Sequence, residues 1–327
     1  MDDLPYAFCE EVCLLLFSET VISANNFSLF AERHNSKRKL WTNAAGAVQN
    51  RIQEGTCDIV LGTSTETMKY HLLLHKFYDA GQWTFEECLA KGFQLRGKIN
   101  VDEIGFKNEK LPECTIDYFV KHVMAHMSSV KITLVVREPQ YLNALYAFVQ
   151  KCNDYHNRIR CENLMFFYPP QGCNDFFPIF QRFLSNLVGK NCLKTLTYNT
   201  LPKDQQKSAA VQAMFEQLFL QPQFTSLTGE PAPFISERAI VDVVKRWMQN
   251  PKTLNHFIRV PELNMEQFEE LGMKTVSDEK TTKVQMEVKH PSVYWRSLTI
   301  CYSKKEEVSN KNSFYLKMSS KEGQIIV

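Results

Sequence analysis

Two pairs of histidines have a spacing that could bind a metal ion. His71 and His75, like His122 and His126, are four residues apart, so on a helix each pair would share one face. Neither pair has a glutamate directly after its first histidine, which helical zinc peptidases use as the general base. A buried or surface histidine is the simpler interpretation of both pairs, and the sequence predicts no metal site and no cofactor.

Ten cysteines are the other candidate ligands and nucleophiles. No two of them have the two-residue gap typical of zinc knuckles and redox motifs. No local signature pairs any of them with a histidine base. We therefore expect buried thiols in a protein of a reducing compartment.

Motifs for phosphate chemistry and acid–base catalysis are not found either. The stretch 92–97 lacks the further glycine and the lysine–serine pattern of a phosphate-binding loop. Neighbouring glutamates such as Glu86 and Glu87 would point about 100° apart on a helix, so they do not form a catalytic pair by themselves. The sequence thus predicts a protein that is not an enzyme.

Composition and charge bound the class of partner. The chain of 327 residues is 44% hydrophobic and 23% charged, as in an ordinary globular protein. Lys and Arg number 38 and Asp and Glu 36, a net charge of +2, whereas proteins that neutralise phosphates carry a large basic excess. Nucleic acid is therefore not an expected partner. Without an apolar leader or a long apolar run, we expect no membrane partner and a cytoplasmic or nuclear protein that is not secreted.

Short β-type runs recur at a nearly constant interval in the second two-thirds of the chain. They lie at 98–106, 130–136, 161–168, 193–199, 224–228 and 254–260. Their central apolar residues are Val101, Ile132, Leu164, Leu196, Leu227 and Phe257, separated by 31, 32, 32, 31 and 30 residues. Units of equal length indicate a repeat in which each unit stacks on the one before.

Amphipathic runs that predict helices alternate with these strands. They lie at 115–126, 141–155, 174–188, 204–220, 236–249 and 265–271. Thr115, Asn174, Asp204 and Ser236 precede or begin four of these runs as candidate N-caps, because their side-chain oxygens can accept hydrogen bonds from free helix amides.

Two architectures fit this alternation: a doubly wound sheet with helices on both faces, or a curved solenoid with helices outside. Equal spacing favours the solenoid. We therefore predict an α/β, leucine-rich-repeat-like curved solenoid of about six strand–helix units, although the usual asparagine pattern is absent. The expected parts are a small helical module at 1–52, an irregular α+β entry segment at 53–97, the repeats at 98–273 and an antiparallel, β-rich C-terminal cap at 274–327.

The first residues carry a more specific pattern. Leu4 and Pro5 open an apolar helical stripe at Phe8, Val12 and Leu15, and Trp41 follows the basic group Lys37-Arg38-Lys39. This arrangement resembles an F-box, which begins with leucine–proline and closes on a tryptophan. Over most of its length the chain resembles a nematode-expanded family of F-box-like proteins, which carry segments similar to 84–89 and strand–helix repeats.

The resemblance implies a non-catalytic adaptor. F-box proteins dock their helical module on the linker subunit of a cullin-type ubiquitin ligase and hold a protein substrate with the downstream repeats. The residues that match the docking positions are Leu4, Pro5, Phe8, Val12, Leu15 and Trp41. The stretch 18–33 departs from the F-box pattern, so a module that only packs against the first repeat stays open.

Two alternatives to the adaptor remain. The first is a repeat scaffold or receptor with no role in ubiquitylation, for which any of the 23 phenylalanines reaching the strand surface would be suited to recognise a protein. The second is an α/β enzyme, which would need polar groups at the carboxyl ends of the strands. The segments expected there, such as 137–139 and 261–262, carry proline, which is typical of turns.

Overall fold

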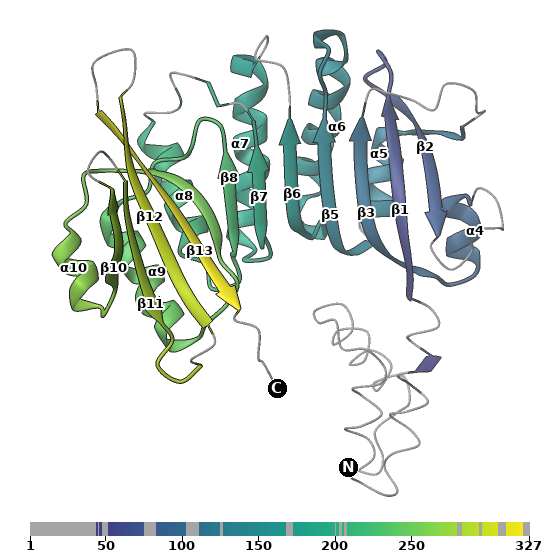
Figure 1. Cartoon of the computed structure of the whole chain (residues 1–327). Helices are drawn as coiled ribbons and strands as arrows, with labels where there is room; N and C mark the ends of the chain where they lie inside the picture. Colours follow the sequence, from purple (N-terminus) through teal and green to yellow (C-terminus); the bar gives the residue numbers. More distant parts are fainter. Residues whose placement is uncertain are drawn as a thin grey trace, which may run out of the picture.

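The computed structural model describes residues 44, 46–47, 52–74, 83–102, 111–124, 127–167, 173–199, 201–202, 205, 208–279, 283–293, 296–306 and 312–322. These residues form an α/β fold around one large mixed sheet of 13 strands, which stays open at both edges (Figure 1). Among them, no helix combines the length and the apolar character needed to cross a bilayer.

The centre of the sheet is a run of parallel strands in sequence order. They are β3 (Gln94–Asp102), β5 (Met127–Val135), β6 (Cys161–Phe167), β7 (Thr195–Tyr198), β8 (Ser226–Gly229) and β9 (Asn255–Val260). The six strands expected from the repeat are therefore present and adjacent. β1 (Ile52–Leu61) adds a further parallel strand beside β3.

A buried ladder of side chains shows how the units are aligned. It runs through Cys57, Ile99, Ile132, Leu164, Leu196, Leu227 and His256. Four of the predicted strand centres lie on it. Val101 was placed wrongly, because it belongs to the next rung and faces Leu134.

Phe257 was also placed wrongly. It is 39% exposed, whereas its neighbour His256 is fully buried. Successive side chains of a strand point to opposite faces, so a choice that is wrong by one residue puts the side chain on the wrong face.

Antiparallel strands flank the parallel run on both sides. β2 (Thr67–Leu74) pairs with β1, and the short β4 (Glu113–Thr115) forms one edge. On the other side β13 (Asn312–Glu322) pairs with β9, followed by β12 (Arg296–Glu306), β11 (Lys283–Lys289) and the edge strand β10 (Lys274–Glu279). The complete order is β10-β11-β12-β13-β9-β8-β7-β6-β5-β3-β1-β2-β4.

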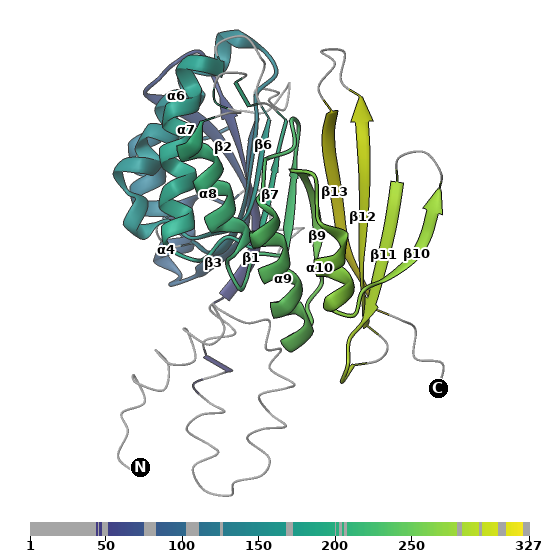
Figure 2. The same ribbon diagram turned by 90° about the vertical axis from the view of Figure 1, so that its left-hand side faces the viewer.

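The helices of the described residues cover one face of the sheet, as Figure 2 shows. They are α4 (Phe85–Ala90), α5 (Ile116–Tyr118), α6 (Leu142–Asp154), α7 (Cys173–Gly189), α8 (Ala209–Phe219), α9 (Glu237–Gln249) and α10 (Met265–Glu270), and α5 continues as a π-helical segment over Phe119–Val123. A doubly wound sheet would carry helices on both faces, so these helices do not follow that architecture.

The first residues of the helices can be compared with the N-caps predicted from the sequence. Thr115 Oγ1 accepts a hydrogen bond from the amide of Tyr118 at 3.1 Å, and Ser236 Oγ accepts one from the amide of Ala239 at 3.4 Å, so both act as N-caps. Asp204 lies outside the described residues, and α8 begins at Ala209, directly after Ser208. Asn174 lies within the first turn of α7, one residue after its start.

Aromatic side chains between the sheet and the helices dominate the core. The ring of Phe166 on β6 stacks on Phe180 of α7 with centroids 3.8 Å apart, and Phe176 lies 5.3 Å from the same ring. Each fully buried side chain of this size contributes about 1.5–3 kcal/mol. This packing holds α7 against β6 and so fixes which face of β6 points away from the helices.

Candidate functional site: the open face of the sheet

The face of the parallel strands that points away from the helices is the candidate site of the described residues. We call the outward positions of β1, β3 and β5–β9 the open face. No described helix covers it, and it faces the viewer in Figure 1. Alternation of buried and partly exposed residues, as in β6 and β9, defines which side chains belong to it.

A row of mostly uncharged side chains crosses the middle of the open face. In ladder order it consists of Asp58, Asn100, Thr133, Met165, Thr197 and Thr228. The amide Nδ2 of Asn100 donates to Oδ1 of Asp58 at 2.7 Å, which uses part of the hydrogen-bonding capacity of that carboxylate. The hydroxyls and amides that remain could bind a polypeptide.

Apolar side chains lie beside this row. Val135 and Phe167 are ladder partners, and both are half-buried like Met165. Further along, Phe257 stacks on Tyr315 with ring centroids 5.7 Å apart and an interplanar angle of 10°. Exposed aromatic and methionine side chains are typical of the anchors of protein interfaces.

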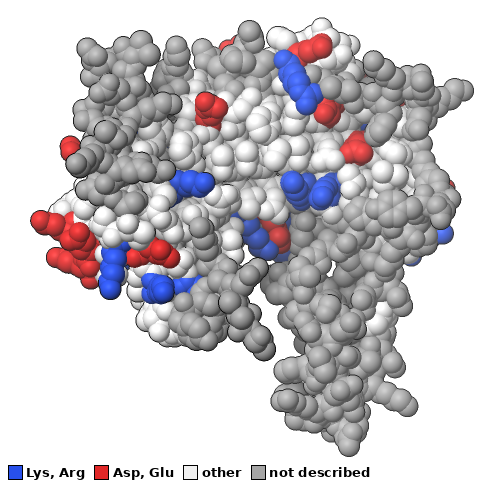
Figure 3. All heavy atoms as spheres, viewed as in Figure 1, with Lys and Arg blue, Asp and Glu red and all other residues white. Residues whose placement is uncertain are grey.

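A second polar row lies nearer to the beginnings of the strands. In ladder order it contains Thr56, Lys98, Lys131, Asn163, Thr195, Ser226 and Asn255. The Thr195 hydroxyl donates to Oδ1 of Asn163 at 2.8 Å. Where Figure 3 shows this face uncovered, most residues are uncharged and charged groups stand at a few places.

Lys98 and Lys131 are direct ladder partners in this row. Neither ammonium group forms an ion pair or hydrogen bond with another described residue. Like charges opposite each other in a sheet are destabilising, so this pair does not serve the stability of the fold. An acidic group of a partner would relieve the repulsion.

Five thiols of the described residues are poorly suited to nucleophilic chemistry. Like the thiols of Cys192 and Cys301, they form no disulfide. Burial raises the pKa of Cys88 to about 11 and that of Cys114 to about 12, and it also raises the pKa values of Cys57, Cys152 and Cys161. At neutral pH these groups are protonated, and the thiol is a weak nucleophile and metal ligand. The described residues contain no group of three or more His, Cys, Asp or Glu that could hold a metal ion.

The residues expected to dock on the ligase linker lie outside the described residues. They are Leu4, Pro5, Phe8, Val12, Leu15 and Trp41. His75 and His126, one member of each histidine pair, lie outside them too. Of the other members, His122 is exposed with its ring 5.1 Å from that of Tyr118, and His71 lies on β2 opposite Asp58.

Sequence reasoning missed Lys98 and Lys131 as candidate binding residues. The signal was available, because the two lysines occupy the same position in successive units. The repeat was aligned on Val101 instead of Ile99, and this offset hid the correspondence.

No protein-family model matches the chain, and a search of curated proteins finds no match.

Proposed function

We propose that this chain is a non-catalytic protein-binding protein, and that the β3–β9 units form a leucine-rich-repeat-like curved solenoid that presents its strands to a partner. Support comes from the in-order parallel strands and from the helices on one side. Each strand adds a similar set of outward side chains to one continuous surface.

The observation that carries the proposal is the open face. Seven parallel strands at a spacing of about 4.8 Å give a surface about 29 Å wide. Such a width, with several rows of side chains, is comparable to one side of a standard protein interface, about 800 Å². The half-buried side chains of Val135, Met165 and Phe167 supply an apolar part of the face, and hydroxyls, amides and the two lysines lie on the side nearer to the strand beginnings.

We further propose that the partner is a protein substrate brought to a cullin-type ubiquitin ligase. This step is supported by the resemblance of the first residues to an F-box. Leu4, Pro5, Phe8, Val12, Leu15 and Trp41 would contact the linker subunit. The alternative function is a scaffold or receptor without a role in ubiquitylation. It would bind its partner with the same open face but would not dock on the ligase linker.

Co-purification with the purified linker subunit tests the adaptor role. We expect the full chain to retain the linker, and we expect a variant with Phe8→Ala and Val12→Ala to lose it, because both apolar contacts are removed. Met165→Arg on the open face is the matched control and should retain the linker.

Two results would refute the adaptor role. One is failure of the intact chain to retain the linker, and the other is undiminished retention by the double variant. Either result would leave the scaffold as the remaining function of the open face.

A further inference from the structure

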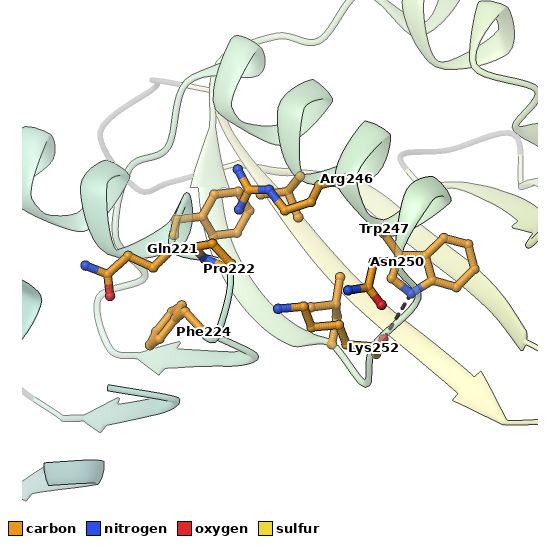
Figure 4. Close-up of a pocket in the computed structure, with 10 residues that line it drawn as sticks. Gln221, Pro222, Phe224, Arg246, Trp247, Asn250 and Lys252 are labelled. Carbon is orange, nitrogen blue, oxygen red and sulfur yellow. Dashed lines mark hydrogen bonds between the residues drawn. The ribbon is translucent and has the colours of Figure 1, made fainter. Parts of the chain in front are cut away.

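A small recess lies on the helix side of the sheet, at the edge where the parallel strands begin. It opens between the end of α8, the last turns of α9 and the loop before β9, and it has about 20 Å³ of free space (Figure 4). Pro222 and Phe224 form one wall and Trp247 lies on the α9 side. None of its ten lining residues is acidic.

Two cationic side chains enter this recess from different elements. Arg246 comes from α9 and Lys252 from the following loop, and Figure 4 shows both among the lining residues. Arg246 Nη1 donates to the carbonyl oxygen of Leu220, which leaves its other N–H groups for a ligand. The Lys252 ammonium makes no hydrogen bond or ion pair with any described residue.

The charge of the two side chains is only partly balanced. The carboxyl ends of α8 and α9 lie close by, and each carries roughly half a negative charge. Together they offset about one of the two positive charges. Burial and the neighbouring Arg246 lower the pKa of Lys252, as expected for an ammonium group beside a second cation.

The loop that carries Lys252 is fixed in place. The backbone carbonyl oxygen of Lys252 accepts hydrogen bonds from Trp247 Nε1 at 3.0 Å and from Ser320 Oγ at 2.8 Å. Arg296 Nη1 donates to the carbonyl oxygen of Pro251 at 2.6 Å. Three bonds therefore hold the backbone from which the Lys252 side chain extends toward the recess.

We propose that this recess binds one oxyanion, a carboxylate or phosphate group, between Arg246 and Lys252. Both side chains carry only hydrogen-bond donors, and charged donors form their strongest hydrogen bonds with oxyanions. The absence of lining carboxylates removes the competing partners. The free volume is close to that needed by one water molecule, so a ligand would place one anionic oxygen between the two cations and stay largely outside the recess.

Titration of the full chain with inorganic phosphate and with acetate, at constant ionic strength, tests this proposal. The indole N–H of Trp247 is the probe, because it donates to the Lys252 carbonyl beside the recess. We expect its NMR signal to shift to saturation. A response to phosphate alone would assign a phosphate group, a response to acetate alone a carboxylate, and a response to both the shared oxyanion chemistry.

Two lysine variants distinguish anion binding in the recess from general electrostatic attraction of anions to the protein surface. Lys252→Met should weaken binding by about tenfold or more, because a charge-assisted hydrogen bond is lost. Lys245→Met removes the same charge from the exposed residue next to Arg246 and should leave the dissociation constant nearly unchanged. No saturable shift with either anion, or equal binding by Lys252→Met and the unmodified chain, would overturn the proposal.

Discussion

His256 is a polar side chain in an otherwise apolar position. It continues the buried ladder between Leu227 of β8 and Met318 of β13. Its ring lies 4.9 Å from that of Phe219 and 5.8 Å from that of Phe224, and neither ring nitrogen has a hydrogen-bond partner. Buried polar atoms without a partner cost about 1–3 kcal/mol, so this residue opposes the stability of the fold.

The same burial makes stability depend on pH. It lowers the pKa of His256 to about 3, whereas the imidazole of an unfolded chain has a pKa of about 6.5. Between these values the unfolded chain binds a proton that the folded chain does not bind. His256 alone therefore lowers the free energy of unfolding by about 1.4 kcal/mol for each pH unit below about 6.5, down to about pH 3.

His256→Leu tests this account at the residue scale. The variant should be more stable at pH 7 by about 1–3 kcal/mol. Its free energy of unfolding should also fall less between pH 7 and pH 5, because the contribution of His256 to that fall is removed. Urea unfolding at the two pH values measures both effects. The control variant His122→Gln, which changes an exposed histidine, should show the same fall in the free energy of unfolding as the unmodified chain. An unchanged pH dependence in His256→Leu would show that its imidazole is not buried in the neutral form.

At the scale of the elements, side chains near the ends of helices bind carbonyl groups of the preceding unit. Lys190 Nζ donates to the carbonyl oxygen of Ile159 at 2.7 Å, and Gln221 Nε2 donates to that of Val188 at 2.6 Å. Arg246 donates to Leu220 in the same manner. The last carbonyl groups of a helix have no partner within it, so the bonds to Val188 and Leu220 add donors at the carboxyl ends of α7 and α8. All three bonds join neighbouring units.

Gln221→Leu should therefore destabilise the fold by about 0.5–1.5 kcal/mol, because it removes one of the two hydrogen bonds that the Val188 carbonyl group of α7 accepts, the other coming from the amide of Asn191. Chemical denaturation at pH 7 measures the change. Gln217→Leu on the exposed face of α8 is the control and should alter stability by less than about 0.5 kcal/mol. Equal stabilities of the two variants would contradict the role of this bond.

Most of these elements could be predicted from the sequence because local pattern and repeat length agree. The strand centred on Leu164 and the helix after Ser236 each show one clear period, and the equal spacing predicted adjacent strands. β9 shows where this reasoning fails. Its Phe257 is the more apolar residue but is exposed, and His256 is polar but buried, so hydrophobicity alone indicates the wrong face.

At the scale of the whole molecule, the register in which neighbouring strands pair decides which side chains meet on the open face. Met165 and Thr133 are neighbours only because β5 and β6 pair in one particular register. The sequence predicts the strands but does not specify that register to the residue. The recess beside Lys252 was harder to foresee, since it brings together α8, α9 and a loop held by Ser320, 68 residues further along the chain.

The central claim is that the open face binds a protein partner, and site-specific photo-cross-linking in cells tests it most directly. A photoreactive residue at Thr197 lies on the open face, and one at Gln217 lies on the exposed side of α8. We predict that a defined protein is cross-linked from position 197 but not from 217, and that Met165→Arg abolishes the adduct. Cross-linking of the same proteins from both positions, or an adduct that persists with Met165→Arg, would contradict the account.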